Sequence, residues 1–195
     1  ATHLVLHGLW PNVRGDARHD YEYCGVAREI RDKDRSRNWC ALPAPGLSEG
    51  LQKRLTPLMP GLQSCLERHE WFRHGACSGL TADQYFEQAT LLVEQMAKTK
   101  FSTYITSNIG KRVSLGSLLS EFDKDFGVGS SRSLAIRCDS KHGASTLTEI
   151  RLSLKRESLT APLSRESFVP AEASDKGSCK KQIAIDPVGL QTRGR

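Results

Sequence analysis

Six cysteines constrain what this chain can fold into more than any other feature of its sequence. They are Cys24, Cys40, Cys65, Cys77, Cys138 and Cys179. The set is even and contains no Cys-x-x-Cys pair, so a zinc ribbon or a thioredoxin-type redox site is disfavoured and three disulfides are expected. Spacing alone does not choose among the possible pairings. Because disulfides persist in oxidising compartments, we expect a periplasmic or secreted protein.

The length and composition predict one soluble, basic domain. The chain has 195 residues, of which 38% are hydrophobic, and no internal repeat or flexible linker divides it. We therefore expect a single domain over residues 1–195. No apolar run approaches the roughly 20 residues needed to cross a bilayer, so no membrane association is expected. The 28 Lys and Arg residues outnumber the 22 Asp and Glu residues, for a net charge of +6. This charge favours an anionic partner such as nucleic acid, although a soluble protein that is merely basic fits it equally well.

The N-terminal part is predicted to hold a strand followed by a long loop. Residues 2–10 mix β-branched and apolar side chains and stop at a Pro-Asn pair, which is typical of a buried strand entering a turn. Residues 13–38 are dense in charge and indicate an exposed loop held by Cys24 and Cys40. Such loops commonly carry substrate contacts.

Helices are predicted in the middle of the chain and strands after them. Apolar side chains at helical spacing predict helices over 48–59, over 65–77, from 81 onward and from 114 to 126. Thr81 with Gln84 has the form of a capping box, and Ser114 is expected to cap the last helix. Alternating patterns then predict strands over 133–138, 148–154 and 182–186. Strands at both ends with helices between them indicate an α+β fold, an antiparallel β-sheet packed against several α-helices. The polar tail 189–195 is expected to fray.

Two short segments concentrate histidine. They are His7-Gly8-Leu9-Trp10-Pro11-Asn12 and His69-Glu70-Trp71-Phe72-Arg73-His74-Gly75-Ala76-Cys77. The second is one residue longer than the zinc-protease motif His-Glu-x-x-His. On a helix each residue advances about 100°, so His69 and His74 would lie roughly 140° apart. We therefore expect no metal ion and no other cofactor.

The same helix would bring four candidate catalytic side chains to one edge, through contacts between residues three and four positions apart. These residues are His69, Glu70, Arg73 and His74. Imidazole titrates near neutral pH and arginine is a permanent bidentate donor to phosphate, so this edge could do acid and base chemistry on an anion. The alternative is an amphipathic helix whose charged side chains only pair with one another at the surface.

In sequence and in order, the two segments resemble the active-site segments of the ribonuclease T2 family. The resemblance extends over nearly the whole chain and implies a ribonuclease T2-like domain. Three further stretches look most similar to the bacterial, periplasmic members: Ser64-Cys65-Leu66-Glu67, Ala161-Pro162-Leu163-Ser164, and Cys179 with Ile185-Asp186. Family members carry an earlier strand and loop before the segment that matches Leu4 to Asn12, and we expect that strand to be missing here.

The resemblance implies a metal-independent endoribonuclease that cleaves single-stranded RNA with low base specificity, by transphosphorylation through a 2′,3′-cyclic phosphate. By motif position, His74 matches the general base and His7 the general acid. His69 matches the histidine that holds the phosphate, and Glu70 matches the acidic residue that supports the charged transition state. Independently of the family, this reaction needs proton-transfer groups on opposite sides of phosphorus and cationic stabilisation of its equatorial oxygens.

Four other positions bear on substrate binding and rate. Trp10 and Asn12 match positions that contact a base, by stacking and at the base edge. Packing of Trp10 in the core is the alternative. Arg73 and Ala76 stand where the family commonly has Lys and Thr. Arg73 keeps the positive charge in a planar fork, so activity is expected with an altered rate.

The resemblance also implies the pairing of the cysteines. The implied disulfides are Cys24–Cys77 and Cys138–Cys179, and with them Cys40–Cys65. The first would clamp the loop region after the first histidine segment against the catalytic helix. The alternative is a cysteine–histidine nucleophile, because Cys77 lies three residues beyond His74.

Two competing functions belong to other classes. One is a catalytically silent RNA-binding protein on the same fold, since a fold does not fix a function. The joint presence of His7, His69, Glu70 and His74 argues against it, because a pure binder needs charge and stacking but no proton-transfer groups. The other is a zinc-dependent hydrolase, which the histidine spacing disfavours. RNA is the expected partner, no obligate protein partner is inferred, and a monomer is expected.

Overall fold

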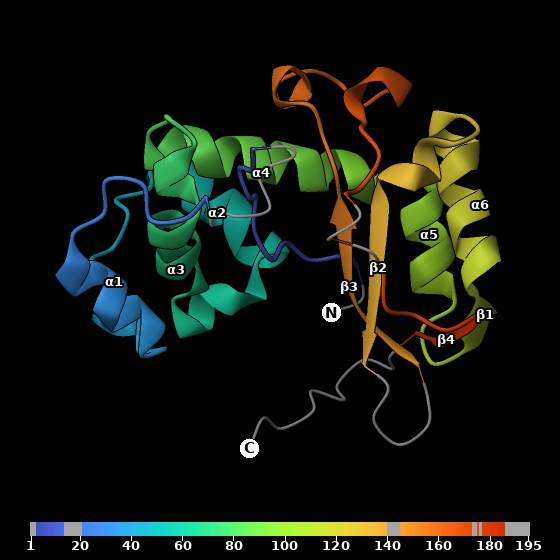
Figure 1. Cartoon of the computed structure of the whole chain (residues 1–195), viewed down its shortest axis with the longest axis horizontal. Helices are drawn as coiled ribbons and strands as arrows, with labels where there is room; N and C mark the ends of the chain where they lie inside the picture. Colours follow the sequence, from blue (N-terminus) through green and yellow to red (C-terminus); the bar gives the residue numbers. More distant parts are fainter. Residues whose placement is uncertain (1–2, 14–20, 140–144, 173–174, 176, 186–195) are drawn as a thin grey trace. The chain divides into compact units, whose positions relative to one another are not determined.

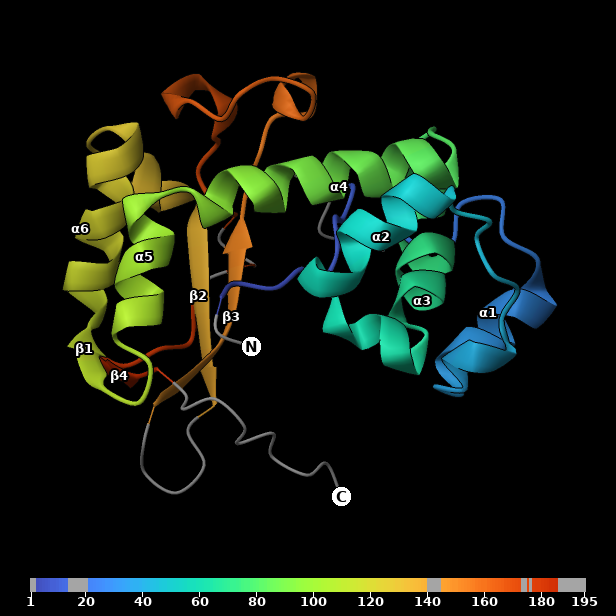
Figure 2. The same cartoon turned by 180° about the vertical axis from the view of Figure 1, so that it is seen from behind.

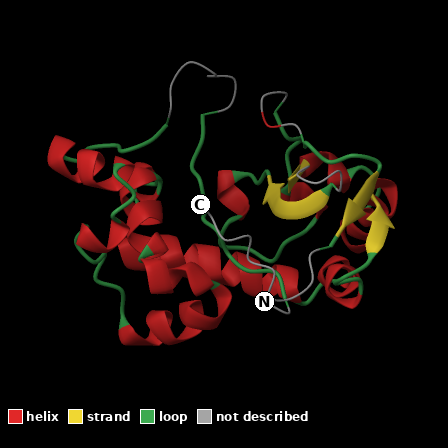
Figure 3. Ribbon diagram, turned by 90° about the horizontal axis from the view of Figure 1, so that it is seen from below, coloured by secondary structure: helices red, strands yellow, loops and turns green. Residues whose placement is uncertain are grey.

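The computed structural model describes residues 3–13, 21–139, 145–172, 175 and 177–185, in two compact units (Figure 1). The helical unit is Val5–Val93, and the sheet unit comprises Ala1–Leu4 with Glu94–Arg195. The single domain expected over residues 1–195 stays a prediction. The strands, drawn yellow in Figure 3, all belong to the sheet unit.

The helical unit contains α1 (Arg28–Arg35), α2 (Glu49–Leu58), α3 (Leu66–Arg73) and most of α4 (Ala82–Ala97). The predicted capping box begins α4, because the Gln84 N–H donates to Thr81 Oγ1 at 3.3 Å and the Thr81 N–H donates to Gln84 Oε1 at 3.0 Å. Both views show α2 and α3 beside α4 (Figures 1 and 2). These helices enclose a core built from Leu6, Leu47, Leu51, Leu55, Met59, Tyr85, Phe86 and Ala89.

The sheet unit contains α5 (Lys100–Ser107), β1 (Arg112–Ser114), α6 (Leu115–Phe126), β2 (Leu134–Asp139), β3 (Thr146–Leu152) and β4 (Gln182–Ala184). As predicted, Ser114 caps α6 by accepting the Ser117 N–H at 2.9 Å. Gly127 follows at φ 96°, a backbone angle that favours glycine. The sequence pattern did not predict α5. Thr99 is the N-cap of this helix, and its hydroxyl accepts the Ser102 N–H at 3.0 Å.

The described strands form one four-stranded sheet in the order β1-β4-β3-β2. The pairs β1–β4 and β2–β3 are antiparallel, as expected. The pair β3–β4 is parallel, through Thr146 and Ala184, so the sheet is mixed. The α+β class is confirmed. The core of this unit is formed by Phe101, Ile105, Val113, Leu118, Phe122, Ile136, Phe168, Ile183 and Ile185.

The strand predicted over residues 2–10 is wrong for the part that the structure describes. Residues 3–13 carry neither strand nor helix. Leu6 donates its N–H to the Leu58 carbonyl at 2.7 Å, and Leu9 donates its N–H to the Tyr85 hydroxyl at 3.3 Å. A helix end and a side chain therefore satisfy backbone groups that a neighbouring strand would otherwise bind.

The loop predicted over residues 13–38 is wrong in one respect, because α1 lies within it. Residues 14–20 of that loop, Asp186 at the end of the last predicted strand, and the tail 189–195 lie outside the described residues. Among the helices that the structure describes, none has the length and apolar character needed to cross a membrane.

Candidate active site

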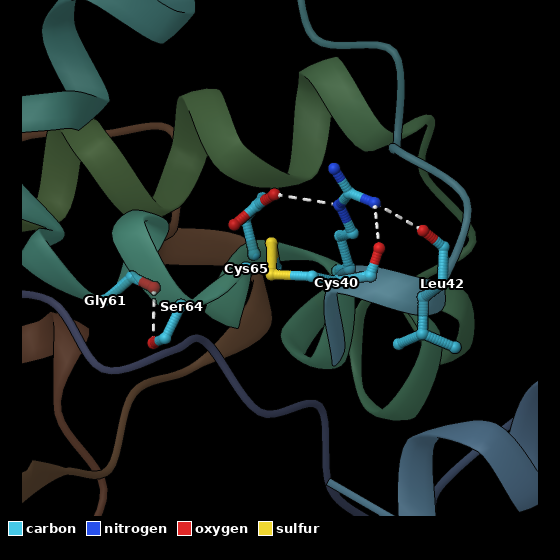
Figure 4. Close-up of a disulfide and its surroundings, with 7 residues drawn as sticks. Cys40, Leu42, Gly61, Ser64 and Cys65 are labelled. Carbon is cyan, nitrogen blue, oxygen red and sulfur yellow. Dashed lines mark hydrogen bonds and ion pairs between the residues drawn. A yellow bond between two sulfur atoms is a disulfide. The ribbon is translucent and has the colours of Figure 1, made fainter. Parts of the chain in front are cut away.

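The five predicted catalytic residues meet within the helical unit. α3 carries His69, Glu70 and Arg73, His74 is its C-cap, and His7 lies on the segment before α1. The start of α3 is anchored by the Cys40–Cys65 disulfide (Figure 4). All five residues therefore belong to one of the two units.

A second anchor lies beside this disulfide. Arg68 Nη1 donates to the carbonyl of Cys40 at 2.9 Å and to that of Leu42 at 2.5 Å (Figure 4). Arg68 Nε lies 3.4 Å from Glu67 Oε1. The first turn of α3 is therefore fixed to residues 40–42 by covalent and polar contacts.

Glu70 is the buried centre of the site. Its side chain is fully buried, and its Oε2 accepts a hydrogen bond of 2.7 Å from Trp10 Nε1. Its Oε1 lies 3.7 Å from His7 Nε2. A Cβ at Gly8 would lie 1.8 Å from Glu70 Oε2 and 2.6 Å from Trp10 Nε1, so glycine is required for this approach. One carboxylate thus joins the two histidine segments.

Burial has a large effect on the protonation of this carboxylate. It raises the pKa of Glu70 to about 7, against the opposing effects of the Trp10 hydrogen bond and of the charges on His7 and Arg73. A carboxylate that titrates near neutral pH is typical of sites that move protons.

Trp10 contacts both histidines predicted to transfer protons. Its ring centroid lies 5.1 Å from that of His7, edge to face, and 5.4 Å from that of His74, at a tilt of 39°. The third predicted histidine, His69, lies edge to face with His74 at 6.1 Å. The predicted base contact Asn12 is exposed on the same segment as Trp10.

His69 is held by two residues that the sequence reasoning missed. Its Nδ1 lies 2.8 Å from Asp34 Oδ1, and its ring stacks on Trp39 with centroids 4.6 Å apart. Asp34 also accepts a hydrogen bond of 2.5 Å from the Tyr23 hydroxyl. Asp34 and Tyr23 come from the region predicted to be an exposed loop, and Trp39 directly follows that region.

Arg73 pairs with another missed residue, Glu22. Its Nη2 lies 2.6 Å and its Nε 2.7 Å from Glu22 Oε1. Partial burial lowers the pKa of Arg73, but the Glu22 hydrogen bond and charge outweigh it, so the pKa is raised. The Arg73 side chain remains 39% exposed, so it is accessible to an anion from solvent.

The partners of α3 are therefore mostly different from the predicted ones. The sequence pattern predicted pairs within the helix, whereas Glu70, His69 and Arg73 each bind a residue from another segment. Tyr85 on α4 is fully buried, and its hydroxyl donates to the Leu9 carbonyl at 2.5 Å. A tyrosine within an apolar stripe is the one signal that could have indicated this support.

The geometry overturns the spacing argument against a shared metal ion. α3 ends at Arg73, and His74 has φ −116° and ψ −51°, so the angle of an ideal helix does not apply to it. Ligand atoms of His69, Glu70 and His74 lie within 4.8 Å of one another. His69 Nδ1 and Glu70 Oε2 are already bound by Asp34 and Trp10, so a cation that kept these bonds would use the other polar atoms of the two side chains. A metal-independent site stays our prediction.

The six cysteines, all among the described residues, form three disulfides. They are Cys24–Cys77, Cys40–Cys65 and Cys138–Cys179, the same pairs that the resemblance implies. Cys77 is therefore no free thiol beside His74, and the cysteine–histidine nucleophile is excluded. The Cys24–Cys77 bond links the region after the first histidine segment to the end of α3.

The fold is that of solved plant ribonucleases. Ribonuclease MC1 from bitter gourd seeds superimposes with a TM-score of 0.60 at 17% identity, over 93% of this chain and 84% of that one. The self-incompatibility-associated SF11-RNase of Nicotiana alata gives a TM-score of 0.52 at 17% identity, over 93% of this chain and 85% of that one. At these identities the likeness defines the class of fold.

Sequence comparison defines the family. The family model described as the Ribonuclease T2 family matches residues 1–165. Ribonuclease I of Escherichia coli is 33% identical over 200 residues, covering 97% of this chain and 73% of that protein. A probable ribonuclease of Haemophilus influenzae is 33% identical over 82 residues, covering 42% of this chain and 24% of that protein. The chain therefore belongs to the ribonuclease T2 family. Both its family and its fold are those of RNA-cleaving enzymes.

Proposed function

We propose that this protein is a metal-independent endoribonuclease that cleaves single-stranded RNA with low base specificity, through a 2′,3′-cyclic phosphate. The observation that carries the proposal is the contact of Trp10 with three of the predicted catalytic groups, which are His7, Glu70 and His74. Two histidines from different segments with a buried carboxylate between them supply what proton transfer at a phosphodiester needs. A protein that only binds RNA has no use for this arrangement.

The reaction follows from the roles of the histidines. His74 accepts the proton of the ribose 2′-hydroxyl, and the 2′-oxygen attacks the adjacent phosphorus. The bond from phosphorus to the 5′-oxygen breaks, and His7 donates a proton to the departing oxygen. The products are a 2′,3′-cyclic phosphate and a free 5′-hydroxyl. DNA is no substrate because it lacks the 2′-hydroxyl nucleophile.

Cationic groups stabilise the phosphorane-like transition state. His69 and Arg73 hold the non-bridging oxygens, whose negative charge increases as the 2′-oxygen attacks. The ionised form of Glu70 keeps His7 oriented, at 3.7 Å. Trp10 and Asn12 contact a base, by stacking and at its edge. Stacking contributes about 1–3 kcal/mol for any base, which suits low specificity.

The compartment and the assembly are part of the proposal. Three disulfides support a protein that matures in an oxidising compartment, either the periplasm or the cell exterior. All the proposed catalytic groups lie in one chain, which supports a monomer with RNA as its partner and no obligate protein partner.

The product ends test this function. The protein is incubated with RNA in excess EDTA, and the ends are identified by mass spectrometry. We expect 2′,3′-cyclic phosphate ends, which disappear in His7→Ala and in His74→Ala but persist in a His3→Ala control outside the site. Intact RNA would instead support the catalytically silent binder, and cleavage that EDTA abolishes would support a metal-dependent hydrolase.

A further inference from the structure

Asp34 is a buried carboxylate on an otherwise solvent-facing helix. α1, which the structure describes throughout, has Asp34 as its one buried residue, with 2% of its surface exposed. The neighbouring acid Asp32 has a side chain that is 61% exposed and lies 3.6 Å from Arg28. Burying a carboxylate is costly unless hydrogen bonds compensate it. Asp34 is therefore not there merely to make the surface of α1 polar, as an exposed acid would be.

Two donors compensate this carboxylate, one on each oxygen. The Tyr23 hydroxyl donates to Oδ2 at 2.5 Å, and His69 Nδ1 lies 2.8 Å from Oδ1. Because an ionised carboxylate only accepts hydrogen bonds, the His69 proton on this side resides on Nδ1. Nε2 is then the ring nitrogen left to meet a ligand.

Tyr23 is itself firmly placed. Only 7% of its surface is exposed, and its backbone N–H donates to the Arg73 carbonyl at 2.8 Å. The next residue, Cys24, is bonded to Cys77 beyond the end of α3. Burial and the Asp34 hydrogen bond raise the pKa of Tyr23 to about 12, so its hydroxyl remains a donor over the working pH range.

One face of the imidazole is fixed as well, by stacking. Trp39 stacks on His69 at an interplanar angle of 23°. The hydrogen bond to Asp34 fixes rotation of the ring within its plane, and the indole limits its tilt. An aromatic wall and a carboxylate together are a common way to hold a catalytic imidazole in one orientation and one tautomer.

We propose that Asp34, supported by Tyr23, is a positioning residue that holds His69 with its Nδ1 protonated and its Nε2 directed to the scissile phosphate. This inference rests on the proposed function, in which His69 binds the non-bridging oxygens. When the ring carries a proton on both nitrogens, Nε2 donates a hydrogen bond to a phosphate oxygen while Nδ1 remains bonded to Asp34. Asp34 acts through His69 and does not itself touch the RNA.

The first test compares two acids on the same helix. Asp34→Asn keeps the size of the side chain and removes its charge, and Asp32→Asn makes the same change at an exposed position. We expect Asp34→Asn to lower kcat/KM for RNA by about 10- to 100-fold. Asp32→Asn should leave it within a factor of two. Equal kcat/KM in the wild type and in Asp34→Asn would overturn the proposal.

A double-mutant cycle separates positioning from a merely structural role. In a His69→Gln background Asp34 has no imidazole to hold, so adding Asp34→Asn should change kcat/KM less than twofold. A structural role would lower activity by the same factor in both backgrounds, and that result would refute the proposal. If Asp34→Asn does not fold, Tyr23→Phe takes its place in the cycle, with a smaller loss in the same direction expected.

A spectroscopic measurement keeps this inference distinct from the proposed function. Ring ¹⁵N spectra of His69 should show a proton on Nδ1 in the wild type, and in Asp34→Asn this preference should be lost. Inorganic phosphate, titrated against the His69 signals, should bind about tenfold more weakly to Asp34→Asn. A wild type that binds phosphate in this way without cleaving RNA would contradict the proposed function alone. Unchanged spectra and phosphate affinity would contradict the role of Asp34 alone.

Discussion

Trp10 and Glu70, 60 positions apart in the chain, are joined by a hydrogen bond of 2.7 Å from the indole N–H to the buried carboxylate. The bond holds the first histidine segment against α3. It also favours the ionised form of Glu70, in opposition to burial. The relative position of the proposed acid and base thus depends on a bond between two other side chains.

Removing this donor should change the pH dependence of cleavage. Trp10→Phe keeps an aromatic ring and deletes the N–H, so the pKa of Glu70 should rise further above about 7. Since the ionised form of Glu70 is the active one, the acidic limb of the kcat/KM profile should move to higher pH by about one unit. Trp71→Phe is the matched control, because that indole packs against Tyr85 with centroids 6.0 Å apart. A limb that moves equally in both variants would refute the assignment.

Neutralising Glu70 should stabilise the protein while lowering its activity. The pKa of Glu70 rises from 4.5 to about 7 on folding, so between these values the folded state binds more protons than the unfolded state. The neutral form of Glu70 therefore stabilises the folded state relative to the ionised form. This contribution to the free energy of unfolding is fully present below about pH 4.5 and is lost as the pH rises through about 7. Glu70→Gln should raise the free energy of unfolding at pH 8 by roughly 1–3 kcal/mol and change it little at pH 4.5. Urea unfolding at the two pH values measures this, and equal effects at both would contradict it.

Gly8 should tolerate no side chain. Its Cβ would overlap Glu70 Oε2 at 1.8 Å, so Gly8→Ala must displace either that carboxylate or the Trp10 indole. We expect a loss of about 1–3 kcal/mol in stability and of at least about 100-fold in kcat/KM. Gly50→Ala on α2 is the control, because nothing lies within 4 Å of its Cβ, and helix propensity should stabilise it by about 0.5–1 kcal/mol. An active Gly8→Ala enzyme would show that Glu70 is placed in some other way.

Much of the fold was predictable because its signals are local. The capping box at Thr81 and the cap at Ser114 begin helices where the sequence predicts them. Strand periodicity located β2 and β3, but it carries no information on the neighbour of each strand, so the parallel pair of β3 with β4 was not foreseen. The strand predicted over residues 2–10 was wrong because a short apolar run is typical both of a strand and of a buried irregular segment.

The site was predictable only in part, for a related reason. Its histidines, Glu70 and Arg73 stand in two compact motifs, whereas the groups that hold them are scattered. α1 has a single apolar residue, Ile30, so no apolar stripe marks it as a packed helix. Asp34 lies 35 positions from His69, and its buried carboxylate contacts both that ring and Tyr23. Nothing in the composition of residues 13–38 separates this acid from its exposed neighbours.

Arg73 offers a test of how the phosphate is held. Arg73→Lys replaces the planar fork by a point charge and weakens the two-nitrogen contact with Glu22. We expect a change of less than about tenfold in kcat/KM, mainly through KM, because the positive charge remains. Steady-state kinetics at two salt concentrations measures this, with Arg54→Lys as a control at a surface ion pair with Glu87. Complete loss of activity would mean that the site is organised around the guanidinium itself.

Two disulfides of similar loop length should differ in what their removal does to catalysis. Cys24–Cys77 closes a separation of 53 residues and Cys138–Cys179 one of 41, so the chain-entropy model gives each about 4 kcal/mol of stability. The first bond adjoins Tyr23 and the end of α3, whereas the second lies in the sheet unit. Replacing either pair by alanine should therefore lower the unfolding midpoint to a similar extent. Well below that midpoint, kcat/KM should fall only for the first pair, because it is the one of these two bonds that adjoins Tyr23, which binds Asp34. Equal losses of kcat/KM in the two variants, measured on fully folded samples, would rule out a special link between Cys24–Cys77 and the site.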